Sequence, residues 1–184
     1  MRIIGGEFRG RKLATPRGMK IRPTADRLRE SIFNILGPTV VHTAVLDLFA
    51  GTGALGLEAL SRGARSALFV DIGRESLDLV GKNIAALHLN DRAQVLRRDL
   101  RRNLACLGQW PPGFDLIFMD PPYGHNLVMP ALAHLRTCGA LAANAHLVVE
   151  HSSDEPLEPA RGGFSLVDQR IYSDTLVSFL NNAV

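Results

Sequence analysis

Four consecutive residues, Asp120-Pro121-Pro122-Tyr123, carry the clearest chemical signal in the sequence. An exocyclic amine on a nucleic-acid base is a poor nucleophile, because its lone pair is delocalised into the ring. The Asp120 carboxylate and the Pro121 carbonyl can each accept a hydrogen bond from one of its N–H groups. These bonds stabilise the positive charge that develops on the amine as it reacts. The prolines restrict the backbone that holds these acceptors, and Tyr123 can stack on a base rotated out of its helix. The tetrapeptide predicts chemistry on an amino group of a base; a rigid turn after a buried strand is the alternative.

A glycine-rich segment, Asp47 to Gly56, runs from a predicted strand into a predicted helix. Gly51, Gly53 and Gly56 satisfy the GxGxxG pattern, in which glycines let a ligand approach the backbone closely. Asp71, about 20 residues further on, suits the ribose hydroxyls of either a nicotinamide or an S-adenosylmethionine cofactor. The glycines alone leave both cofactors open.

Acidic residues at the ends of predicted strands favour S-adenosylmethionine. Asp47 precedes Gly51 by four residues, where its charge suits the amino group of this cofactor and would repel a pyrophosphate; a structural carboxylate that caps the loop is the alternative. Asp99 ends the third predicted strand and can accept a hydrogen bond from the adenine amino group. The carboxyl ends of parallel strands meet at one edge of a sheet, where ligands bind. The predicted cofactor contacts are Asp47, Phe49, Gly51, Gly53, Asp71, Ile72, Asp99, Leu100 and Asp120.

Positive charge is concentrated near the N-terminus. Residues 1–30 hold nine Lys or Arg against three acids, a net charge of +6, whereas the whole chain carries +3. Each phosphate that such a segment neutralises adds sequence-independent affinity for a nucleic acid, although a solvated basic tail has the same composition. Arg22 and Arg27 fit either the cofactor cleft or an anchor for the first helix. The predicted RNA contacts are Arg9, Arg11, Lys12, Arg22 and Arg27.

Composition predicts one globular domain with a small extension, because 184 residues with 46% hydrophobic side chains can bury a sizeable core. The sequence lacks both an apolar run of the roughly 18 residues that a membrane span needs and the apolar core of a signal peptide. We therefore expect a cytoplasmic protein. Cys106 and Cys138 have neither a paired framework nor a metal-ligand spacing, so no metal site is expected.

Strand-like and helical runs alternate from residue 44 onward. The predicted strands are 45–49, 67–71, 94–96, 115–119 and 146–150, and the predicted helices between them are 55–61, 76–87 and 126–136. This alternation predicts an α/β fold with a parallel sheet covered by helices on both faces. Two extended runs, 164–172 and 175–180, predict a closing antiparallel hairpin.

Ahead of the sheet, residues 2–13 predict a small irregular hairpin that is too polar to be core. An amphipathic helix follows, with Thr24 as its candidate N-cap and its end near Gly37-Pro38. We expect residues 1–38 to form a basic, RNA-contacting extension and residues 39–184 to form a methyltransferase domain.

Six segments give the sequence its resemblance to a known family: Met1–Gly6, Arg9–Leu13, Arg22–Arg27, Phe33–Leu36, Asp47–Gly63 and Asp120–Tyr123. Together they resemble the RsmD-type 16S ribosomal RNA (guanine-N2) methyltransferases of bacteria, over essentially the full chain. The resemblance implies a class I S-adenosylmethionine-dependent methyltransferase fold, with a mostly parallel seven-stranded sheet and an RNA-contacting N-terminal hairpin. It also implies methylation of one guanine N2 in 16S rRNA of the small ribosomal subunit, with S-adenosylhomocysteine as product. We expect the protein to act as a monomer. Ser173 departs from the glycine expected in the last turn.

Three other functions remain open from the residues alone. A DNA adenine-N6 methyltransferase would use the same acceptors for its amine. A nicotinamide oxidoreductase fits the GxGxxG pattern, although the chain offers no evident hydride-handling site. A non-catalytic RNA-binding or ribosome assembly factor would need only the basic N-terminal segment.

Overall fold

The computed structural model describes residues 1–16, 23–110, 113–155 and 157–182. The chain forms two compact units, Met1–Arg98 and Asp99–Val184.

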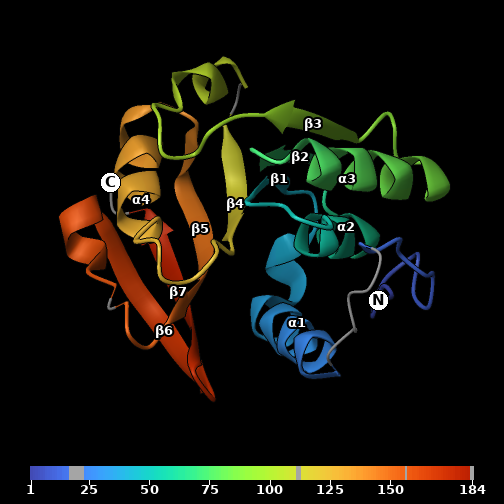
Figure 1. The fold of residues 1–184 in the computed structure, drawn as a ribbon, viewed down its shortest axis with the longest axis horizontal. Coiled ribbons are helices and arrows are strands. Elements are labelled where there is room, and N and C mark those ends of the chain that lie inside the picture. Colours follow the sequence, from blue (N-terminus) through green and yellow to red (C-terminus); the bar gives the residue numbers. More distant parts are fainter. Residues whose placement is uncertain (17–22, 111–112, 156, 183–184) are drawn as a thin grey trace. The chain divides into compact units, whose positions relative to one another are not determined.

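The first unit contains a three-stranded parallel sheet (Figure 1). Its elements are α1 (Pro23–Leu36), the 3-10 helix η1 (Gly37–Val40), β1 (Ala44–Leu48), α2 (Ala54–Ser61), β2 (Ser66–Asp71), α3 (Arg74–Ala86) and β3 (Ala93–Arg97). The strand order within this unit is β3-β2-β1. Every residue of β1 is buried, as expected for a strand covered on both faces. The predicted strands and helices of this unit are confirmed to within one or two residues.

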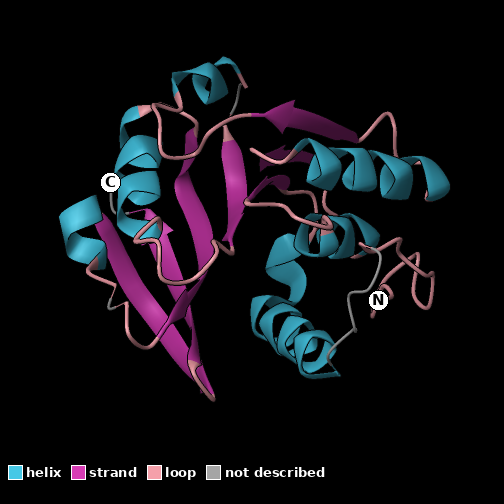
Figure 2. Ribbon diagram, in the orientation of Figure 1, coloured by secondary structure: helices cyan, strands magenta, loops and turns pink. Residues whose placement is uncertain are grey.

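The second unit combines a parallel strand pair with an antiparallel hairpin (Figure 2). Its elements are η2 (Ala105–Gln109), β4 (Phe114–Met119), α4 (Val128–Thr137), β5 (Leu141–Ser152), η3 (Pro159–Gly162), β6 (Phe164–Tyr172) and β7 (Thr175–Asn182). β4 pairs with β5 in parallel, and β7 pairs antiparallel with both β5 and β6. The predicted closing hairpin is confirmed. β5 begins five residues before the predicted strand, because its first residues are partly exposed and lack an apolar run.

The turn between β6 and β7 has two residues, Ser173 and Asp174, since Tyr172 pairs with Thr175. Ser173 has a φ of 57°, a left-handed conformation that favours glycine. The departure at Ser173 therefore leaves the turn in place, at the cost of a strained backbone.

The first 14 residues, called the arm from here on, form an irregular hairpin closed by an antiparallel bridge between Arg2 and Lys12. The Ile3 N–H donates to the Arg11 carbonyl at 3.0 Å. Ile3 and Leu13 are 1% and 6% exposed, so the prediction that this hairpin is too polar to be core was wrong. The hairpin turns these two aliphatic side chains inward while its basic side chains stay outside.

The helical element after the arm is confirmed as α1, which ends at Leu36 before Gly37. The side chain of Thr24, its candidate N-cap, lies outside the described part of the chain. Within the described ranges, none of the helices combines the length and the apolar character that crossing a membrane requires.

Candidate active site

The loop between β1 and α2, Phe49–Gly53, is called the cofactor loop from here on. Phe49, Gly51 and Gly53 have φ angles of 58°, 54° and 75°, all left-handed. A Cβ on Gly53 would lie 3.1 Å from Val80, so this position needs glycine for both backbone and space. A Cβ on Gly56 would overlap the Phe69 ring, which explains the third glycine of the pattern by the packing of α2 on β2. The positive φ angles fix the course of the loop backbone, and glycine at positions 51 and 53 adopts them without strain.

Asp47, on β1, is only 2% exposed. Its Oδ2 accepts a hydrogen bond from the Gly56 N–H at 2.9 Å, so it does cap the first turn of α2. Burial raises the pKa of Asp47 to about 7; the Gly56 hydrogen bond opposes this rise and the negative charge of Asp71 adds to it. A carboxyl group poised in this way becomes fully charged when a cationic ligand group approaches.

Asp71 ends β2 and fixes the backbone on both sides of the loop. Its Oδ2 accepts from the Gly51 N–H at 2.9 Å, and its Oδ1 accepts from the Gly73 N–H at 2.7 Å. Each carboxylate oxygen has a second lone pair, so Asp71 retains acceptor capacity for ribose hydroxyls. The next residue, Ile72, is 51% exposed and offers an apolar surface of the kind that packs on an adenine ring.

Asp99 begins the second unit, and its carboxylate is paired. Arg101 donates to Oδ1 and Oδ2, both at 3.0 Å, from Nε and Nη2, and these bonds lower the pKa of Asp99. An adenine amino group would therefore share the carboxylate with Arg101. Leu100 is buried, with 4% exposure.

The tetrapeptide Asp120–Tyr123 follows β4 directly. Asp120 is exposed and Pro121 is buried. The Tyr123 hydroxyl donates to Glu150 Oε1 at 2.7 Å and lies 3.0 Å from Thr175 Oγ1. Both partners come from the strand pair β5 and β7. The hydroxyl is therefore anchored while the side chain remains part-exposed.

Glu150 and Thr175 belong to this site although they were not among the predicted residues. Burial raises the pKa of Glu150, and burial is likewise the main cause of the raised pKa of Tyr123. Glu150 closes the predicted strand 146–150, as Asp47, Asp71 and Asp120 lie at or near the ends of theirs. Its place at the end of a predicted strand could have identified Glu150 as a site residue. Nothing in the sequence around Thr175 indicated that it belongs to the site.

The predicted RNA-contacting residues Arg9, Arg11, Lys12 and Arg27 are all exposed, and Arg22 lies outside the described residues. Arg11 donates to the Ala86 carbonyl at 3.0 Å, which ties the arm to the end of α3.

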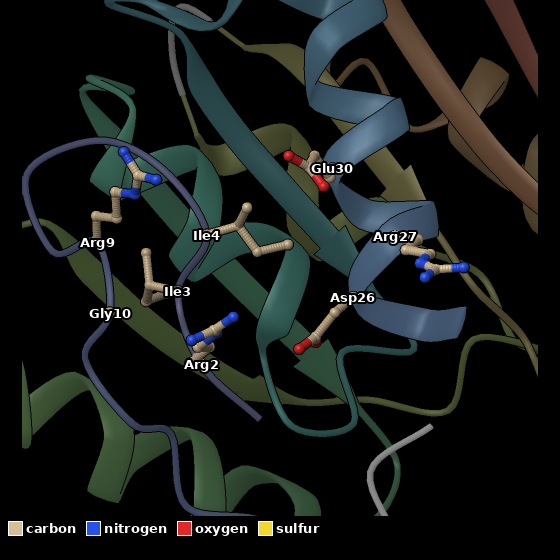
Figure 3. Close-up of a pocket in the computed structure, with 8 residues that line it drawn as sticks. All are labelled: Arg2, Ile3, Ile4, Arg9, Gly10, Asp26, Arg27 and Glu30. Carbon is tan, nitrogen blue, oxygen red and sulfur yellow. The ribbon is translucent and has the colours of Figure 1, made fainter. Parts of the chain in front are cut away.

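A cavity of about 380 Å³ lies between the arm and α1 (Figure 3). Arg2 and Arg9 line it from the arm, and Asp26, Arg27 and Glu30 line it from α1. Asp26 is paired with the buried Arg29 at 3.0 Å. The lining holds three arginines against the two acidic residues Asp26 and Glu30, so the cavity carries net positive charge. Arg2 was not predicted as a contact.

A buried glutamate, Glu58 on α2, holds the arm in place. Its carboxylate accepts the N–H groups of Ile4 and Gly5 and the Nε–H of Arg62, each at 2.8 Å. Arg29 Nε lies 3.6 Å from the same group. Sequence reasoning missed this cluster, because a glutamate in a short helix gives no sign of partners more than 50 residues away.

Among the described residues, no group of three or more His, Cys, Asp or Glu side chains is placed to hold a metal ion.

The chain is similar to proteins of one kind over nearly its whole length. A family model described as "Conserved hypothetical protein 95" matches residues 1–181. A Bacillus subtilis protein named "Putative rRNA methyltransferase YlbH" is 37% identical, with 97% of each chain covered. An Escherichia coli protein named "Ribosomal RNA small subunit methyltransferase D" is also 37% identical, over 93% of this chain and 84% of that protein.

A solved Escherichia coli structure, "Putative methyltransferase yhhF", superimposes with a TM-score of 0.86 at 36% identity, over 98% of this chain and 97% of that one. The fold is therefore the class I methyltransferase fold, as predicted.

Proposed function

The chain belongs to the RsmD-type family of small-subunit ribosomal RNA methyltransferases, and we propose that it transfers a methyl group from S-adenosylmethionine to the exocyclic N2 of a guanine in 16S rRNA. The observation that carries the proposal is the match to small-subunit methyltransferases over nearly the full chain, joined to a tetrapeptide suited to an amine. The substrate is the RNA of the small ribosomal subunit, and the protein acts as a cytoplasmic monomer.

Residues of the first unit bind the methyl donor in this proposal. The donor's sulfonium makes its methyl group ready for transfer without further activation. Asp47 receives the donor's amino group, and the ionic contact keeps the carboxylate charged. Asp71 accepts hydrogen bonds from the ribose hydroxyls, and Ile72 packs on the adenine.

Residues of the second unit hold the donor and the target amine. Asp99 accepts from the adenine amino group and Leu100 completes the adenine contact. The Asp120 carboxylate and the Pro121 carbonyl each accept a hydrogen bond from one N–H of the guanine amine, which fixes its lone pair in line for transfer. Pro122 limits movement of this backbone. Tyr123, anchored through its hydroxyl to Glu150, stacks on the base.

The arm and α1 contact the RNA backbone. Arg9, Arg11 and Lys12 are exposed on the arm, and Arg2, Arg9 and Arg27 line the cavity of Figure 3. Guanidinium groups bind phosphate oxygens in a bidentate manner. Replacing Arg9, Arg11 and Lys12 together by alanine is expected to weaken RNA binding and to reduce the slope of log K against log salt by up to about 3. An unchanged slope would assign these side chains to a solvated surface.

The Asp120→Ala variant tests the chemistry directly. Transfer of a labelled methyl group to small-subunit RNA from cells that lack the chain should be lost, while S-adenosylhomocysteine binding largely survives. Asp154→Ala, at an exposed aspartate in the same unit, is the matched control and should retain activity. Full activity of Asp120→Ala would refute the proposed role.

Mass analysis of the methylated nucleoside tests the target. N2-methylguanosine is expected, whereas N6-methyladenine in DNA would indicate the rival chemistry. RNA binding without any transfer by the wild-type protein would indicate an assembly factor instead.

A further inference from the structure

We propose that Asn83 is a positioning residue that couples RNA on the arm to the methyl donor in the cofactor loop. Asn83 lies on α3 and is only 2% exposed. Its role rests on the proposed function, because that function supplies both ligands.

The Asn83 side chain joins the arm to the cofactor loop through a single amide group. Its Oδ1 accepts the Ala14 N–H at 2.7 Å, and its Nδ2 donates to the Ala14 carbonyl and to the Thr52 carbonyl, each at 3.2 Å. An asparagine amide has one acceptor oxygen and two N–H donors, so all of these groups are used. Because the Ala14 N–H can only donate, the amide orientation is fixed.

The two carbonyls that Asn83 binds belong to segments with different proposed ligands. Ala14 ends the basic arm, whereas Thr52 lies between Gly51 and Gly53 in the cofactor loop. If Ala14 moves and reorients the Asn83 side-chain amide, the hydrogen bond from Asn83 to the Thr52 carbonyl must change as well. The position of the arm and the position of the cofactor loop are therefore linked through one side chain.

The cofactor loop is a segment whose order such a bond can influence. Phe49 is a non-glycine residue with a φ of 58°, a conformation that persists only when the surrounding structure holds it. A loop already held in its binding conformation binds its ligand more tightly, because less ordering remains to be done. RNA that binds the arm and holds Ala14 in place should thus raise the affinity of the cofactor loop for the methyl donor.

The far part of the arm is attached to the same region by other bonds. Glu58 and Ser61 of α2 bind the backbone of Ile4, Gly5 and Phe8, and α2 begins directly after Gly53. These bonds fix the arm near the C-terminal end of α2. Asn83, in contrast, bonds both the arm and the cofactor loop itself.

Coupling of this kind is reciprocal, so RNA and donor raise each other's affinity by the same factor. A factor of at least about 5 is expected, at the lower limit of typical coupling between sites. Asn83→Asp keeps an acceptor for the Ala14 N–H but removes both donors. Ala14→Pro, at an exposed residue, removes the N–H of the arm and places the proline ring against Asn83 Oδ1, while the bond from Asn83 to Thr52 stays available.

The experiment measures S-adenosylhomocysteine binding by calorimetry, with and without small-subunit RNA purified from cells that lack the chain. In the wild-type protein the RNA should tighten binding at least fivefold. Both Asn83→Asp and Ala14→Pro should reduce this ratio to near 1, and Asn83→Asp should also weaken binding without RNA. Asn90→Asp, at an exposed asparagine between α3 and β3, is the control and should keep the wild-type ratio.

The outcomes separate the two proposals. If the wild-type protein binds S-adenosylhomocysteine and both variants keep its ratio, or if the wild-type ratio is itself near 1, the coupling through Asn83 is refuted and the proposed function stands. If the wild-type protein binds no S-adenosylhomocysteine, the proposed function and the coupling fall together. A purely structural role would lower stability while the ratio stayed unchanged in Ala14→Pro, which also refutes the coupling.

Discussion

Asp47→Asn should raise the stability of the free protein at neutral pH while it weakens donor binding. The pKa of Asp47 is about 7 in the folded chain, against an ordinary value of 3.8. Between these values the folded chain binds a proton that the unfolded chain has lost, so the free energy of unfolding falls as pH rises. Each pH unit contributes about 1.4 kcal/mol. An asparagine keeps an acceptor for the Gly56 N–H but does not titrate.

The stability difference between Asp47→Asn and wild type should therefore widen by about 3 kcal/mol from pH 5 to pH 8, in favour of the variant, with no further change above pH 8. Urea unfolding of both proteins at these two pH values measures it. A difference that stays constant, or that narrows, would refute the buried, proton-binding carboxyl.

Donor binding should follow the opposite trend. The wild-type carboxyl must lose its proton to receive the ligand's ammonium group, so S-adenosylhomocysteine affinity should rise toward pH 7, by up to tenfold per unit, and then level off. Asp47→Asn should bind about 10- to 100-fold more weakly at pH 8, the equivalent of one charge-assisted hydrogen bond, without this pH dependence. Calorimetry across pH 5.5 to 8 measures both. A flat wild-type profile would contradict a contact between Asp47 and the amino group.

Three further substitutions test other parts of the structure. Glu58→Gln replaces one buried acceptor oxygen by a donor that faces other donors, and should lower the free energy of unfolding by about 3 to 5 kcal/mol; thermal unfolding measures this, with exposed Glu30→Gln as control. Tyr123→Phe removes the hydroxyl that is bonded to Glu150, and should lower kcat several-fold while S-adenosylhomocysteine affinity is unchanged. Ser173→Gly should raise the free energy of unfolding by about 0.5 to 1 kcal/mol, because glycine adopts the positive φ without strain.

For each of these three predictions, one outcome would contradict the reasoning. A loss below about 1 kcal/mol for the glutamine variant would mean that the arm does not depend on its buried acceptor. A tyrosine variant with wild-type kcat would show that the anchored hydroxyl plays no part in presenting the ring. A lower melting temperature for the glycine variant would show that the left-handed turn residue is not strained.

The sheet and the cofactor loop were predictable because they depend on short-range patterns. The β1 run around Leu46 is continuously apolar, and glycines follow it where the chain must turn into α2. Asp47 and Asp71 could be assigned to the site because they lie at or near the carboxyl ends of predicted strands, and parallel strands bring these ends to one edge of the sheet. Local sequence could not reveal that Asp71 also binds the backbone of Gly51, because such a bond depends on how two loops meet.

The arm resisted prediction for a different reason. Its basic residues suggested a solvated extension, yet Ile3 is 1% exposed and the Ile4 N–H bonds to Glu58 across 54 positions of sequence. Asn83, at 69 positions from Ala14, is likewise an ordinary helix residue by type and spacing. The positive charge of the arm could be predicted from its residue types. Its hydrogen-bond partners could not, because they depend on tertiary packing.

These long-range hydrogen bonds bear on whether the arm is a separate part of the structure. The division into residues 1–38 and 39–184 stays a prediction about function, and it does not require the arm to fold independently. The arm supplies backbone N–H groups to Glu58, which is 0% exposed, and to Asn83 beside the cofactor loop. Removing it would leave a buried carboxylate with fewer donors and would take from Asn83 both of its hydrogen bonds to Ala14, which costs free energy in the part that remains. The segment whose basic residues are predicted to contact RNA is therefore also a structural part of the unit that carries the cofactor loop.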